Sequence, residues 1–153
     1  MHKLLLCPKS LEEKSVTYEN YIKAMLVHFA VGEAYHEGSS ISVLAIAQVL
    51  KNRVDAGWGD WMHVIETAPN YAGTVRERPK VDPQDVMFRK ILLGIDDIYY
   101  GIADDGDVNN DEFRSLYYAE LHNINRAWFL ENVLNDLESH PRVAKVGQID
   151  FFA

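Results

Sequence analysis

The 153-residue chain contains a single cysteine, Cys7, so no second cysteine is present to pair with it. This count excludes an internal disulfide framework and a metal site built from cysteines, and it fits folding in a reducing compartment. The first ten residues hold only three consecutive leucines, too few for a signal-peptide core or a membrane span. We therefore expect a protein made in the cytoplasm that does not insert into a membrane.

Positive charge is also scarce, because 15 lysines and arginines face 23 aspartates and glutamates, which gives a formal net charge of −8. Nucleic-acid binding depends on cationic side chains that displace counterions, so this balance predicts no nucleic-acid partner but allows a local basic patch. We find no repeats and no Pro- or Ser-rich linkers. A single domain over 1–153 is expected, with a core from about residue 17 onward and an N-terminal extension, 1–16.

In several segments of the chain, apolar residues recur with the periodicity of an α-helix. Helices are expected at 17–34, 39–54, 60–66, 82–100 and 126–137. The second of these is apolar nearly all round, which is typical of a central buried helix. Short strands are expected at 115–119 and 143–152, and irregular loops at 69–83 and 104–112. The expected fold class is α+β, predominantly α-helical with a small β-sheet.

Glu33 lies on the apolar face of the first expected helix. It follows Ile22, Leu26 and Phe29 at steps of four, three and four residues, so its carboxyl group is directed toward the core. An ionised carboxylate there is costly, so the group holds a proton, caps a helix, pairs with Arg53 or faces a cleft. A carboxyl group that keeps its proton at a cleft can protonate a leaving glycosidic oxygen. Position alone leaves the structural and catalytic interpretations open.

Five segments carry a family resemblance, in the same order and with matching spacing over about residues 25–153. They are VGEAYHEGSSISVLAIAQVLKNRV (31–54), VIETAPNYAG (64–73), FRKILLG (88–94), SLYYA (115–119) and VGQIDFFA (146–153). Together they resemble the SleB-like cell-wall hydrolase family, which implies a lysozyme-like fold. Glu33 would then be the catalytic acid that acts on the bond between N-acetylmuramic acid and N-acetylglucosamine. Asn70-Tyr71 stand where the family commonly has Gln-Phe, and Ile149 stands where it has His.

The resemblance also implies how peptidoglycan, the expected partner, would be bound and cleaved. The residues that would line the glycan groove are Asn70, Tyr71, Tyr117 and Tyr118. Lytic transglycosylation, in which one Glu acts as acid and then base, is the commoner chemistry that the resemblance points to. A hydrolytic muramidase would use a second carboxylate, about 5 to 9.5 Å away. The candidates for it are Glu37, Asp55, Asp60 and Glu66.

Several alternatives are compatible with the sequence. Glu33 and His36 have the spacing of a di-iron ligand pair, but a second such pair is missing. Oxygen ligands alternate over 105–111 as in a calcium loop, but Asn110 replaces the turn glycine and Leu116 the final glutamate, so a solvated acidic turn is expected. We expect no metal and no cofactor. The absence of an export signal fits a phage-encoded lysin or virion lysozyme, and a non-catalytic glycan-binding or virion structural module is the remaining class.

Overall fold

The computed structural model describes residues 11–102, 114–120 and 127–153 of the chain. Cys7 and the acidic segment 105–111 lie outside these residues. The α-helices are α1 (Leu11–Ala34), α2 (Ser40–Asp55), α3 (Trp61–Glu66), α4 (Tyr71–Arg76), α5 (Val86–Tyr100) and α6 (Ala127–Asn132). The remaining elements are the 3-10 helices η2 (Tyr35–Glu37) and η4 (Leu134–Asp136) and the strands β1 (Tyr117–Ala119), β2 (Arg142–Val146) and β3 (Ile149–Phe152). The predicted class, predominantly helical α+β with a small sheet, is confirmed.

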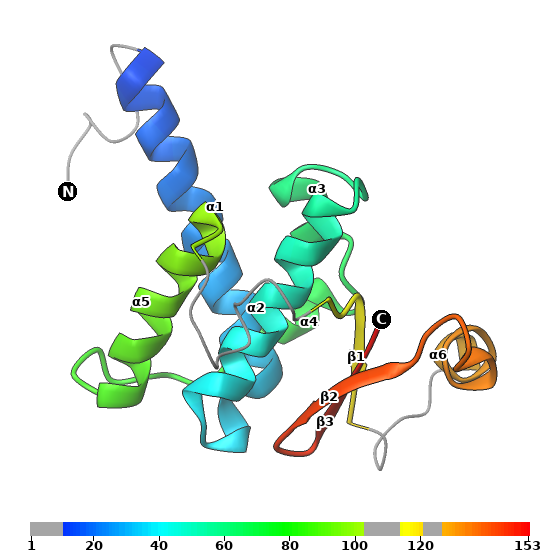
Figure 1. The fold of residues 1–153 in the computed structure, drawn as a ribbon. Coiled ribbons are helices and arrows are strands. Elements are labelled where there is room, and N and C mark those ends of the chain that lie inside the picture. Colours follow the sequence, from blue (N-terminus) through cyan, green and yellow to red (C-terminus); the bar gives the residue numbers. More distant parts are fainter. Residues whose placement is uncertain (1–10, 103–113, 121–126) are drawn as a thin grey trace.

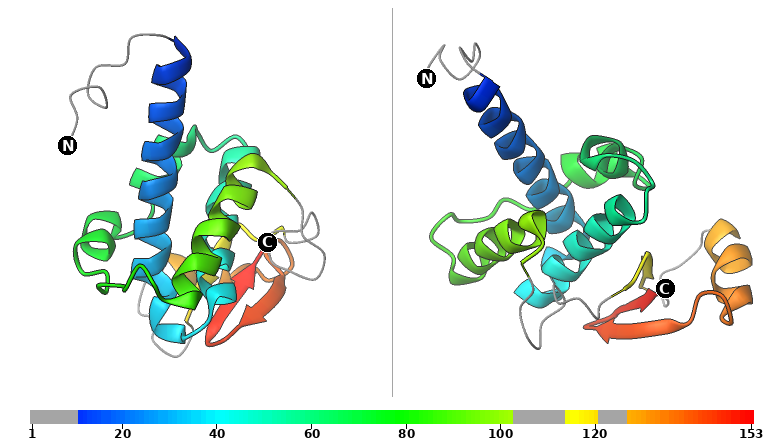
Figure 2. Two further views of the ribbon diagram at one scale, coloured as in Figure 1. Left: turned by 90° about the vertical axis from the view of Figure 1, so that its left-hand side faces the viewer. Right: turned by 45° about the horizontal axis from the view of Figure 1, so that its top comes forward.

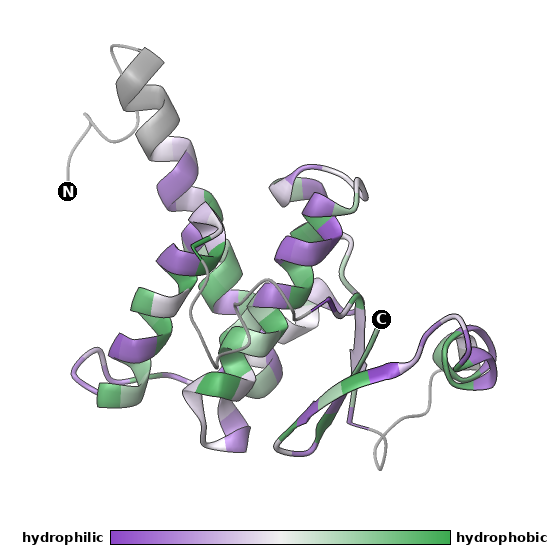
Figure 3. Ribbon diagram, viewed as in Figure 1, coloured by the Kyte–Doolittle hydropathy of each residue, from purple (hydrophilic) through white to green (hydrophobic). Residues whose placement is uncertain are grey.

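Helix α2 forms the centre of the packing. Its residues from Ser42 to Leu50 are all buried, which confirms the prediction of a central buried helix. Helices α1, α3 and α5 pack against it, and the sheet lies beside it (Figures 1 and 2). Helix α5 carries both hydrophobic and hydrophilic residues, as expected of a helix with one solvent-facing side (Figure 3). The core therefore lies between α2 and the helices around it.

The sheet has three antiparallel strands in the order β1-β3-β2. Residues 143–152, predicted as one extended segment, form the hairpin of β2 and β3 instead. Gly147 adopts φ 59° between the two strands, a left-handed conformation that suits a glycine in a tight turn. All four residues of β3 are buried, and Phe151 is paired with Tyr118 of β1. The hairpin thereby fixes the position of β1.

Helix α4 corrects the prediction that residues 69–83 form an irregular loop. The breaker residues Asn70 and Gly73 hid its helical signal, yet Asn70 begins the helix in a left-handed conformation with φ 56°. Packing of α4 against α1 stabilises this single short helix in spite of its weak local propensity. Two other limits also differ. Helix α1 begins at Leu11, inside the predicted extension, and the predicted helix 126–137 divides into α6 and η4.

Candidate active site

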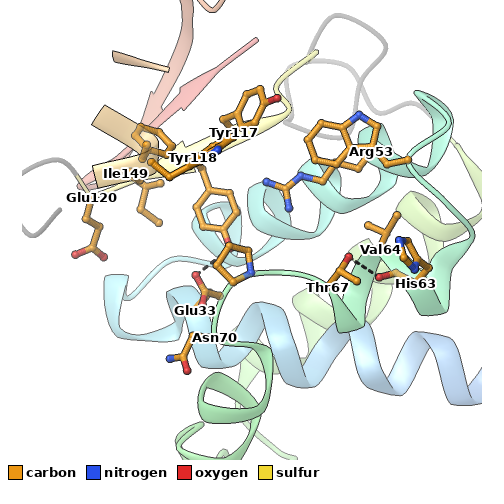
Figure 4. A pocket seen from close by; sticks show the side chains of 15 residues that line it. Glu33, Arg53, His63, Val64, Thr67, Asn70, Tyr117, Tyr118, Glu120 and Ile149 are labelled. Carbon is orange, nitrogen blue, oxygen red and sulfur yellow. Dashed lines mark hydrogen bonds between the residues drawn. The ribbon is translucent and has the colours of Figure 1, made fainter. Parts of the chain in front are cut away.

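The carboxyl group of Glu33 is the point where three elements meet. Thr74 Oγ1, from α4, donates a hydrogen bond of 2.8 Å to Glu33 Oε1. The hydroxyl of Tyr118, from β1, donates one of 2.9 Å to Glu33 Oε2 (Figure 4). Glu33 itself is half-buried in the last turn of α1. Because a hydroxyl group can both donate and accept, these two contacts can persist whether or not the carboxyl group carries a proton.

Arg53 does not form the ion pair with Glu33 that its position allowed. Its Nε donates to the carbonyl oxygen of Leu116 at 2.9 Å, and its guanidinium lies 5.0 Å from the centre of the Trp58 ring. Asn52 Nδ2 donates to the carbonyl oxygen of Ser115 at 2.8 Å. These two side chains attach the residues that precede β1 to the last turns of α2. They therefore help to hold Tyr118 against Glu33.

A pocket of about 750 Å³ opens beside Glu33. Aromatic rings form part of its lining, with Tyr117 between Trp58 at 5.7 Å and Trp128 at 6.1 Å, measured between ring centres. The two tryptophans are exposed, so their rings can contact a ligand. The rest of the lining is mixed: it includes apolar residues such as Val64 and Ile149 and polar ones such as His63, Asn70 and Glu120 (Figure 4). This mixture suits a ligand with both apolar faces and hydrogen-bonding edges.

Three of the four predicted glycan-binding residues line this pocket, namely Asn70, Tyr117 and Tyr118. Tyr71 does not. Its ring stacks on Phe29 at 6.1 Å, and its hydroxyl lies 3.5 Å from Met25 Sδ, so it packs against α1. Burial raises the pKa of the Tyr71 hydroxyl, in agreement with this packed position. Tyr71 therefore anchors α4 to α1, whereas its neighbour Asn70 faces the pocket.

The carboxylates predicted as possible partners of Glu33 lie outside the pocket. Glu37 accepts a hydrogen bond from the backbone N–H of Gln148 at 2.9 Å, in the turn of the hairpin. Asp55 pairs with Lys51 at 2.7 Å. Asp60 caps α3, and Glu66 lies exposed at the end of the same helix. None of the four is among the residues that line the pocket.

Glu120 is the carboxylate that the structure brings to the pocket, and the sequence reasoning missed it. It lies two residues after Tyr118, and side chains at that spacing in an extended segment share a side. This alternation was the signal that could have identified Glu120. Thr74 was missed as well, because it lies in the segment that was predicted to be a loop.

Glu120 also belongs to a cluster with His36 and Glu37. His36 Nε2 lies 2.6 Å from Glu120 Oε1 and 3.3 Å from Glu37 Oε2, and the three ligand atoms lie within 4.8 Å of one another. The Nε2–H of the imidazole can donate to Glu120 Oε1, and the three ligand atoms are of types that bind a divalent cation. His36 faces Glu120 and Glu37 rather than Glu33, so the spacing of Glu33 and His36, which alone resembles a di-iron ligand pair, does not bring these two side chains together.

A comparison with protein-family models, curated proteins and solved structures found no match. The SleB-like family and the lysozyme-like fold thus stay predictions from the sequence. Among the described residues, no helix has the length and apolar character needed to cross a bilayer. The candidate site consequently rests on the geometry around Glu33.

Gly32 explains how α4 comes close enough to bond Glu33. A Cβ added at Gly32 would overlap the backbone oxygen of Thr74 and would lie 2.7 Å from Thr74 Cγ2. The absence of a side chain therefore allows α4 to approach α1 directly beside the carboxyl group. Gly32 and Glu33 together form the surface on which Thr74 is seated.

We expect Gly32→Ala to destabilise the protein by about 1–3 kcal/mol, the usual cost of overpacking, because a backbone oxygen has little room to move. Chemical denaturation measures this change. Gly94→Ala is the matched control, since the three atoms nearest its Cβ would belong to the Leu44 side chain, the first of them 2.5 Å away, and not to the backbone. An equal or smaller loss at Gly32 than at Gly94 would contradict the close-approach explanation.

Proposed function

We propose that this protein cleaves the glycan backbone of bacterial peptidoglycan, with Glu33 as the general acid and base. The observation that supports this proposal is the position of the Glu33 carboxyl group, half-buried in the wall of the pocket, where its hydrogen bonds from described residues come from the hydroxyl groups of Thr74 and Tyr118. Lysine or arginine contacts would fix the group as a carboxylate, whereas hydroxyl contacts allow it to give up and regain a proton.

The rings in the pocket fit a sugar substrate. A pyranose ring has apolar C–H faces, which pack against aromatic side chains, and hydroxyl groups at its edge, which need hydrogen-bond partners. Trp58, Tyr117 and Trp128 supply aromatic rings for the C–H faces. Asn70 and His63 supply hydrogen-bond partners for the hydroxyl groups. A pocket of about 750 Å³ has the size of a ligand-binding cleft.

The proposed reaction is lytic transglycosylation. The Glu33 carboxyl group gives its proton to the glycosidic oxygen, and the bond between this oxygen and C1 of the muramic acid breaks. The resulting carboxylate then removes a proton from the 6-hydroxyl of the same sugar, whose oxygen bonds to C1. A 1,6-anhydro end forms, the proton is back on Glu33, and no water is consumed. Tyr118 and Thr74 orient the carboxyl group during both transfers.

Hydrolysis is the second candidate, and the presence of Glu120 in the pocket favours it. Glycosidases use two carboxyl groups, one of which activates water or attacks the sugar directly. Glu120 could serve in this role if substrate separated it from His36, which it contacts at 2.6 Å. The two chemistries differ in their products, because a hydrolysed reducing end is heavier than an anhydro end by one water.

Digestion of purified peptidoglycan, followed by mass spectrometry of the fragments, tests the proposal and separates the two reactions. Under transglycosylation we expect anhydro ends, and we expect Glu120→Gln to retain activity within about tenfold. Under hydrolysis we expect reducing ends and a loss of roughly 10²–10⁴-fold in Glu120→Gln. If no preparation of cell wall yields fragments, the protein is instead a binding or structural module.

The proposal also includes the route to the substrate. We propose that the protein is made in the cytoplasm and delivered to the wall by other proteins, as a phage lysin is.

A further inference from the structure

A second groove lies on the other side of α1. Val27 and Val31 line it, and at 100° per residue they project roughly opposite to Glu33 on the helix. Its volume is about 800 Å³, and its other walls are the segment 76–81 and α5. Its apolar lining includes Val27, Val31, Val81, Phe88, Leu92 and Ile95. The groove is therefore separate from the pocket that contains Glu33.

The groove is cationic although the chain carries a formal net charge of −8. Its basic side chains are Lys23, Arg76, Arg78 and Lys80, with His28 beside them. Asp96 is the single carboxylate in the described lining, and it lies 3.2 Å from Lys23. Within the described residues, Arg76, Arg78 and Lys80 form no ion pair. Three cations without an ion-pair partner among the described residues thus lie along one wall of the groove.

The pKa of His28, which lines this groove, is lowered in part by a positive charge. Burial lowers the pKa of His28, and the charge of Arg78 lowers it further. Arg78 itself is held by a hydrogen bond of 2.6 Å to the carbonyl oxygen of Val75. This bond connects the guanidinium to the last turn of α4. An anion bound in the groove would be favoured by the same field that disfavours a proton on His28.

We propose that this groove binds acidic peptides, and, resting on the proposed function, that its ligand is the carboxylate-bearing peptide stem of the cell wall. Arg76, Arg78 and Lys80 would bind carboxylates, and the apolar lining would bury methyl groups and methylene chains of the peptide. A nucleic-acid backbone offers few apolar groups for such a lining. Both the protein and the cell wall carry net negative charge. The cations of the groove can still attract wall carboxylates, because salt screens the protein's other charges where they lie more than about 8–10 Å away.

The test measures binding to insoluble peptidoglycan by co-sedimentation, with Glu33→Gln in every protein to prevent digestion. We expect Arg76→Gln/Lys80→Gln to weaken binding at least about tenfold at low salt, since two charge-assisted contacts are lost. Arg89→Gln/Lys90→Gln is the matched control, because it removes the same charge from exposed positions of α5 outside the groove. We expect it to bind within about twofold of the parent. Amidation of the wall carboxylates should weaken the binding of the parent protein as strongly as Arg76→Gln/Lys80→Gln does.

Three outcomes would overturn the inference: equal losses in both double variants, full binding to amidated walls, or binding to anionic phospholipid vesicles but not to peptidoglycan. Thermal denaturation of each variant checks that the fold is intact. The proposed catalysis is tested separately, with Glu33 restored. Arg76→Gln/Lys80→Gln should then cleave soluble glycan oligomers that lack peptides at the parent rate. If the parent does not cleave glycans but the binding pattern holds, the groove stands without the proposed activity.

Discussion

Replacement of Glu33 by Gln is expected to lower the rate of peptidoglycan cleavage by roughly 10²–10⁴-fold, the contribution of general acid–base catalysis. The amide has the shape of the carboxyl group but no proton to transfer. Thr74 and Tyr118 can still hydrogen-bond to it, so the loss of activity should occur without loss of the fold. The clearance of a peptidoglycan suspension and the release of soluble fragments measure the rate.

Glu66→Gln is the matched control for this prediction. Glu66 is exposed at the end of α3 and does not line the pocket. Glu66→Gln therefore removes the same carboxyl group as Glu33→Gln, but at a position outside the proposed site. We expect it to keep the parent activity and the parent midpoint of thermal unfolding. Glu33→Gln protein that clears peptidoglycan as fast as the parent would rule out Glu33 as the acid. A large decrease in its unfolding midpoint would point to a structural role instead.

Tyr118→Phe is expected to slow cleavage by about 5- to 150-fold, which corresponds to about 1–3 kcal/mol for an unsatisfied, half-buried polar atom. The substitution removes the 2.9 Å hydrogen bond to Glu33 Oε2 but keeps the ring that packs near Phe151. The carboxyl group would then be held on one side alone, by Thr74. We expect the loss to appear in kcat, because the orientation of the acid changes while the pocket walls remain.

Tyr71→Phe is the control for this second prediction, and it also tests a residue that the resemblance assigned to the substrate. The Tyr71 ring packs on Phe29, away from the pocket, so removal of its hydroxyl should leave the rate within about twofold of the parent. Thr74→Val, which removes the hydroxyl bonded to the other carboxyl oxygen, should resemble Tyr118→Phe. A strong effect of Tyr71→Phe together with a normal rate in Tyr118→Phe would contradict the geometry of the site.

Local pattern predicted the parts of the site that lie within one helix. The steps from Ile22 to Glu33 correctly directed the carboxyl group to the inner side of α1, since helical periodicity is a property of neighbouring residues. The burial of α2 was predicted for the same reason. Helix α4 was missed because Asn70 and Gly73 weaken its local signal, and its stability comes from contact with α1.

The sequence by itself determined the fold class, the central buried helix and the direction of Glu33. Only the tertiary structure decided which groups meet that carboxyl group. Thr74 lies 41 residues away along the chain and Tyr118 lies 85 residues away. The tertiary structure also places Glu120 in the lining of the pocket and packs Tyr71 against α1, outside the pocket. Periodicity specifies which face of a helix or strand is buried. The pairing of side chains that are distant in the sequence depends instead on how closely two elements can approach. Here the absence of a side chain at Gly32 allows α4 to approach α1.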